Sequence, residues 1–152
     1  ETERYGEYSK AGEFIYDHPF LWGSKRTGPD LHREGTGNKQ SKSNIWHFNH
    51  FYDPEAVSEG SIMPPYPWLI EDQLDVSSLG AKISAMRKLG VPYEDRYEEI
   101  ALEELQYQAM EIADDIAANG VEVSSDREVI ALIAYLQRLG TDINNAEVVP
   151  VK

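Results

Sequence analysis

The second half of the sequence contains three segments whose apolar residues recur at the spacing of an α-helix and that each end at a glycine. The first follows Ser77 or Ser78, either of which can cap a helix, and ends at Gly90. Its apolar residues are Leu79, Ile83, Met86 and Leu89. No run alternates between apolar and polar residues for long enough to indicate a sheet. The sequence therefore predicts an all-α protein.

The other two segments carry clearer boundaries. The longer one is predicted to run from about Glu94 to Asn119 and to end at Gly120. Its expected apolar stripe is Tyr97, Ile100, Leu105, Ala109, Ile112 and Ile116. The last helix is predicted to start at a capping box of Ser125 and Glu128 and to end at Gly140. Its expected buried face is Val129, Ile130, Ile133, Leu136 and Leu139.

Residues 1–76 are instead rich in glycine, proline, histidine and aromatic residues, with poor periodicity. Short helices are predicted over residues 9–17 and over residues 44–52, the second capped by Ser43 and stopped by Asp53-Pro54. The three prolines of residues 59–69, EGSIMPPYPWL, predict an ordered but irregular loop. Three tryptophans in the irregular segments are expected to line one hydrophobic centre: Trp22, Trp46 and Trp68.

The formal net charge of −13 disfavours nucleic acid and anionic membrane surfaces as partners. The excess is concentrated between Glu94 and Glu128, where twelve acidic and two basic residues give a net charge of −10. Residues 1–53, with eight acidic and seven basic residues, are nearly neutral. The acidic segment is either a solvated helix surface or a docking face for a basic partner.

Met63 is the first candidate for chemistry, because a thioether is a soft donor to low-valent copper or haem iron and prolines 64, 65 and 67 stiffen its surroundings. A methionine that simply fills a gap in the core is the alternative. His47 and His50 share a helix face and could join Met63 in a metal site, or be ordinary histidines. The chain has no cysteine and no recognised nucleotide-binding, hydrolase or zinc-protease motif.

Four stretches resemble, in order, the mono-haem cytochrome c subunit of cbb-type, C-family haem–copper oxidases. They are ERYGEYSKAGEFIYDHPFLWGSKRTGPDLHREG (3–35), SIMPPYPWL (61–69), MRKLGVPY (86–93) and ALIAYLQRLGT (131–141). The first two are specific to that family, whereas the last has the general form of the C-terminal helix of many small c-type cytochromes. The resemblance implies a single cytochrome c-like domain over residues 1–152, with a loop-rich haem-crevice half (1–76) and a helical half (77–152).

The resemblance implies roles for several residues. Met63 matches the methionine on the sixth coordination position of the haem iron. Gly28 and Pro29 match a turn that packs on the histidine side of the haem, where a proline carbonyl orients the ligating imidazole. Trp22 is expected near the haem edge, and Arg26 is a candidate to pair with a propionate. Tyr135 and Leu136 are expected to pack against the family's haem-bearing helix.

The family attaches its haem through CxxCH upstream of the ERYG stretch and has a transmembrane anchor earlier still. The resemblance therefore implies that this chain is a fragment lacking the CxxCH motif, the membrane anchor and the N-terminal haem-bearing helix. We expect no covalently bound haem on it, and exposed crevice faces that collapse or self-associate. His32, where the family pattern has a small residue, is expected at the surface and not as a ligand.

The implied function is one-electron transfer through haem c in the complete protein, so the chain is a subunit of an oxidase and no enzyme by itself. Its implied partners are the catalytic membrane subunit and a further cytochrome c subunit, on the periplasmic side of the bacterial inner membrane. The alternative is a haem-free interaction module that docks a basic partner through the acidic helix.

Overall fold

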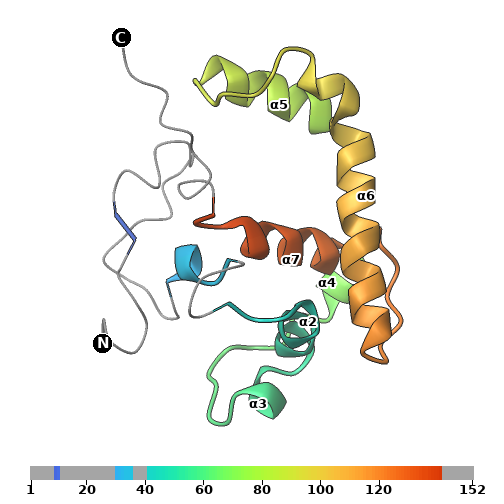
Figure 1. Cartoon of the computed structure of the whole chain (residues 1–152). Coiled ribbons are helices and arrows are strands. Elements are labelled where there is room, and N and C mark those ends of the chain that lie inside the picture. Colours follow the sequence, from blue (N-terminus) through green and yellow to red (C-terminus); the bar gives the residue numbers. More distant parts are fainter. Residues whose placement is uncertain (1–8, 11–29, 36–40, 142–152) are drawn as a thin grey trace. The chain divides into compact units, whose positions relative to one another are not determined.

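The computed structural model describes residues 9–10, 30–35 and 41–141 of the chain (Figure 1). The chain divides into two units, of which one comprises residues 1–42 and 135–152 and the other residues 43–134. Within the described residues the regular structure is helical, and the β pairing is one isolated bridge between Gln73 and Arg127. The prediction of an all-α chain is confirmed at this level. The helix predicted over residues 9–17 lies outside the described residues, except for Ser9 and Lys10.

Two short helices open the larger unit, and the first is bounded as the sequence predicts. In α2 (Asn44–Tyr52) the side chain of Ser43 accepts a hydrogen bond from the N–H of Trp46, which confirms the predicted cap. Asp53 ends α2, and its side chain accepts from the N–H of Ala56 to cap α3 (Pro54–Val57). Pro54 at the first position of α3 costs no hydrogen bond there, so Asp53-Pro54 separates two helices.

The hydrophobic core of this unit is formed by α2, α6 (Tyr97–Ala118) and α7 (Glu128–Arg138). Ile116, Val129, Ile130 and Ile133 have no exposed surface. Side chains from the one-turn helix α4 (Trp68–Glu71) pack against the same cluster through Leu69 and Ile70. Burial of such branched aliphatic side chains is the main favourable term for holding helices together. The predicted buried face of the last helix is thus confirmed.

The start of α7 differs from the predicted capping box. The helix begins at Glu128, two residues later than a cap at Ser125 would place it. The backbone there pairs with another segment, since the N–H of Leu74 donates to Asp126 O (2.8 Å) and that of Glu128 donates to Asp72 O (3.2 Å). The second of these tertiary hydrogen bonds satisfies the Glu128 N–H, which the side chain of Ser125 would serve in a capping box.

The N-terminal part of α6 packs against α5 (Leu79–Lys88). Here the predicted stripe is wrong at one position, because Ile100 is 45% exposed and its neighbour Ala101 is only 5% exposed. The α5 helix approaches the side of α6 that carries Glu98, whose Cβ would lie 3.8 Å from a Cβ added at Gly80. Residues three apart share a helix face, so Ala101 is covered with Glu98 and Ile100 is turned outward.

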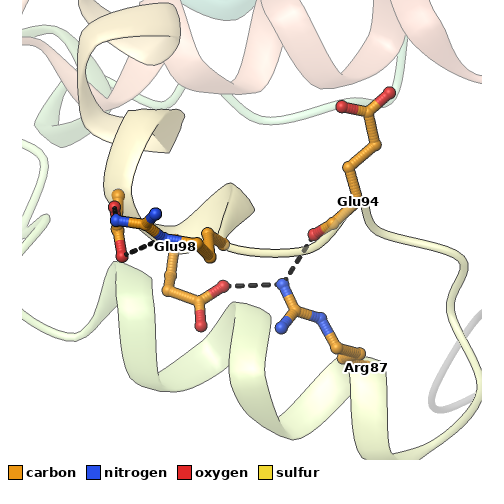
Figure 2. A network of polar contacts seen from close by, with 5 residues as sticks. Arg87, Glu94 and Glu98 are labelled. Carbon is orange, nitrogen blue, oxygen red and sulfur yellow. Dashed lines mark hydrogen bonds and ion pairs between the residues drawn. The ribbon is translucent and has the colours of Figure 1, made fainter.

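Polar contacts fix the turn between α5 and α6 (Figure 2). Arg87 donates from Nη2 to the Glu98 carboxylate (2.6 Å) and to the Glu94 carbonyl oxygen (2.8 Å). The pKa of Glu98 is lowered, first by a hydrogen bond from its own backbone N–H and further by Arg87.

Gly90 has φ of 97°, as a left-handed helix stop requires. Ser78 occupies the cap position of α5 without a side-chain hydrogen bond, and Leu89, the last apolar residue of the predicted helix, is 58% exposed.

The described part of the smaller unit joins residues 30–35 to the end of α7. Asp30 caps the 3-10 helix η2 (Leu31–Arg33) by accepting from the N–H of His32, and it also accepts from Ser9 (2.7 Å, Oγ). A side chain at Gly140 would overlap the carbonyl oxygen of His32, and one at Gly35 would overlap that of Leu139. The two backbone segments therefore approach as closely as glycine allows.

Candidate functional site

Met63 lies in an irregular segment, residues 60–68, that we call the Met63 segment. Its first turn uses Gly60 at φ of 76° and a hydrogen bond from the N–H of Ser61 to Ser58 O (3.0 Å). The N–H of Met63 itself donates to Ser61 Oγ (3.3 Å). Prolines 64, 65 and 67 follow, and each fixes its own φ. The irregular loop predicted over residues 59–69 is confirmed up to Pro67, whereas Trp68 and Leu69 belong to α4.

Tyr66 holds the other end of the Met63 segment. Its N–H donates to Phe51 O at the end of α2 (2.8 Å), and its ring meets that of Phe51 edge to face, with ring centroids 6.3 Å apart. Its ring also packs edge to face on Trp68, at 5.2 Å. The segment is therefore tied at one end to α2 through Tyr66 and begins at the other end in a turn bonded to Ser58, the residue after α3.

Met63 is half-buried, and two large apolar residues of the same stretch of chain face solvent. Ile62 is 90% exposed and Trp68 is 51% exposed. We call these two residues the apolar edge of the stretch, because exposed side chains of this size leave apolar surface that a planar apolar group can cover. A thioether held on such a backbone can act as a soft ligand without large rearrangement when its metal changes charge.

The tryptophans of the larger unit do not form the hydrophobic centre that the sequence analysis expects. Trp46 stacks on His50 with ring centroids 4.5 Å apart, whereas Trp68 packs on Tyr66. Neither ring belongs to the buried cluster, which is mostly aliphatic. Side chains of α2, α6 and α7, most of them aliphatic, fill that space, and the two tryptophans lie outside the cluster. Trp22 lies outside the described residues.

The histidines of α2 occupy different environments. His47 is 3% exposed, and the half-buried His50 has its pKa lowered by burial. Among the described residues, no group of three or more histidine, cysteine, aspartate or glutamate side chains is placed to hold a metal ion. Methionine is not among these residue types, so a metal site of His47, His50 and Met63 stays a prediction from the sequence.

His32 is buried, at 4% exposed, so the expectation that it lies at the surface is wrong. The close approach of its backbone to Gly140 explains this, because it brings residues 30–35 against the end of α7. Glu34 beside it is 6% exposed, and burial raises its pKa, with Lys42 opposing and Asp30 reinforcing the shift. The sequence analysis missed this buried carboxyl, and a short polar stretch gives no periodic signal for it.

Four of the predicted site residues, Trp22, Arg26, Gly28 and Pro29, lie outside the described residues, as does His18. Their relation to Met63 remains a prediction from the sequence. In the part of the chain that the structure describes, no helix is long and apolar enough to cross a membrane.

The helical architecture and the restrained methionine are consistent with an all-α, cytochrome c-like class of protein. Over residues 1–143 the chain matches the family described as "Cytochrome C oxidase, mono-heme subunit/FixO". The chain belongs to the FixO family, the mono-haem subunits of cbb3-type cytochrome c oxidases. None of the curated proteins matches it. The resemblance found in the sequence is confirmed.

Proposed function

We propose that the complete protein is a one-electron carrier that passes electrons to the catalytic membrane subunit of the oxidase, with Met63 as an axial ligand of its haem iron. Membership of the FixO family supports the oxidase assignment. The observation that carries the role of Met63 is its position in a proline-rich segment tied at both ends, at Ser61 and at Tyr66. When bound, haem c supplies a one-electron couple whose potential the axial ligand helps to set.

The chain's own residues would bind and shield the haem. Met63 would contribute its sulfur, and the apolar edge formed by Ile62 and Trp68 would exclude water from the crevice. The 152 residues contain no cysteine, so they cannot form the thioether bonds of a haem c. The family resemblance implies a CxxCH motif upstream of the ERYG stretch, which would provide them in the complete protein. Residues 1–152 would belong to the same single cytochrome c-like domain.

Further roles are proposed from the family resemblance. The Gly28-Pro29 turn would orient the histidine ligand, Trp22 would lie near the haem edge and Arg26 would pair with a propionate. Partners would be the catalytic subunit and a further cytochrome c subunit, at the periplasmic face of the inner membrane, with an anchor preceding the CxxCH motif. The chain itself would catalyse no bond chemistry.

The test is Met63→Ala in the complete, haem-bearing protein, with the haem potential measured by redox titration. We expect a markedly lower potential, because the loss of a methionine ligand removes a group that favours the reduced iron. Met86→Ala is the matched control, since Met86 is also half-buried but lies on α5. A potential that both variants leave unchanged would remove Met63 from the ligand set.

A further inference from the structure

The middle of α6 has few neighbours. From Leu102 to Glu111 no residue is fully buried, and only Leu105 and Ala109 are half-buried. The helix is held at its ends instead, by α5 near Ala101 and by the core at Ile112, Ala113 and Ile116. In Figure 1 no other described helix runs alongside this middle stretch. A helix segment that faces solvent so widely ordinarily carries polar residues.

Large apolar side chains nevertheless lie on its outward side. Ile100 is 45% exposed, Tyr107 65% and Met110 58%. Tyr107 follows Ile100 by seven residues and precedes Met110 by three, which turns all three away from the buried Ile112 and Ile116, with Met110 at the margin beside the buried Ala113. We call this set the outward face of α6. Its apolar residues cannot be covered by the elements that pack on the other side.

Acidic side chains surround these three residues. Glu103, Glu111 and Asp114 are exposed on the same side of the helix. Glu111 also accepts a hydrogen bond from the Tyr107 hydroxyl, which raises the pKa of that tyrosine. No lysine or arginine occurs in the sequence between Arg96 and Arg127. Near the N-terminal end of α6, Arg87 of α5 pairs with Glu98 and Arg96 pairs with Glu99.

We propose that the outward face of α6 docks a basic protein segment whose apolar residues cover Ile100, Tyr107 and Met110 while its lysines or arginines meet the surrounding carboxylates. Charge complementarity selects this occupant. A second copy of the chain would set the same acidic residues against each other, and anionic lipid or nucleic acid would be repelled. The surface involves neither Met63 nor a haem, so it stands independently of the electron-transfer function.

The test uses the full 152-residue chain and a labelled helical peptide of lysine and leucine as the probe, with binding followed by fluorescence anisotropy. The apolar variant combines Ile100→Gln, Tyr107→Gln and Met110→Gln, all to a good helix former. We expect it to weaken binding about tenfold or more, as loss of central apolar anchors does. A peptide with serine in place of leucine should bind much more weakly than the leucine peptide. Equal binding of the two peptides, or an unaffected apolar variant, would overturn the proposal.

The charge contribution has its own matched pair of variants. One combines Glu103→Gln, Glu111→Gln and Asp114→Asn. The control combines three exposed acids elsewhere in the same unit, Glu55→Gln, Glu59→Gln and Glu122→Gln, and changes the net charge equally. We expect the first to weaken binding and flatten its salt dependence, and the control to leave both nearly unchanged. Equal losses in the two variants would mean that net charge, and not this face, attracts the peptide.

A photo-crosslinking amino acid at Tyr107 extends the test to the full-length protein in cells. The same substitution at Tyr52 is the control, because Tyr52 is 63% exposed but lies at the end of α2. We expect a crosslink to a protein of net positive charge from position 107 alone. Crosslinks only to further copies of this chain, or equal crosslinks from both positions, would count against the proposal.

Discussion

Replacing Ile116 by alanine should destabilise the chain severely, whereas the same replacement at Ile100 on the same helix should matter little. Ile116 has no exposed surface and lies in the core between α2, α6 and α7. Ile→Ala removes three carbon atoms, worth roughly 2.4 kcal/mol when fully buried at about 0.8 kcal/mol each. The cavity left behind raises this toward about 4 kcal/mol.

Ile100 offers the same chemistry without the burial. Because Ile100 is 45% exposed, Ile100→Ala should lose only about half of the burial free energy given above, roughly 1.2 kcal/mol. The higher helix propensity of alanine offsets about 0.4 kcal/mol of the loss at each position. We therefore expect the two variants to differ by about 3 kcal/mol in the free energy of unfolding.

Urea unfolding followed by far-UV circular dichroism measures this difference, provided that the slope with denaturant is the same in both variants. A difference below about 1 kcal/mol, or a larger loss of stability at Ile100 than at Ile116, would refute the conclusion that Ile100 lies outside the buried side of α6 and that Ala101 lies on it. It would also undermine the outward face, since Ile100 would then be a core residue.

Three further predictions concern stability. Ser43→Ala should cost about 1 kcal/mol through loss of the α2 cap, whereas Ser78→Ala, where no side-chain cap hydrogen bond exists, should be nearly neutral in urea unfolding. Gly140→Ala should be clearly more destabilising than Gly60→Ala. Both glycines have a positive φ, which costs an alanine about 1–2 kcal/mol, but only at position 140 would the added Cβ also collide with neighbouring backbone. Burial raises the pKa of the Glu34 carboxyl above its ordinary 4.5, so the contribution of Glu34 to stability is present below that value and is lost as pH rises through the raised pKa. Glu34→Gln should remove this component from the pH dependence of the urea midpoint. An unchanged pH profile would contradict the prediction.

The candidate site was predictable to different degrees. Met63 stood out because prolines around a methionine form a local pattern, and the structure adds that Tyr66 ties this segment to the end of α2. The burial of His32 and Glu34 was not predictable, because it arises from backbone contact with residues about a hundred positions further along the chain. Local patterns encode which backbone conformations are accessible, and they carry no information about such distant neighbours.

The sequence by itself determined the helices of the second half, since apolar spacing and glycines at Gly90, Gly120 and Gly140 act within a few residues. It also determined the family, through motifs that span most of the chain. Only the tertiary structure decided that Ala101 and not Ile100 is buried, because that depends on the side from which α5 approaches. It likewise moved the start of α7 to Glu128, where backbone pairing with residues 72–74 replaced the local capping box. Such choices follow from packing and from long-range hydrogen bonds, which overrule local preferences worth only about 1 kcal/mol.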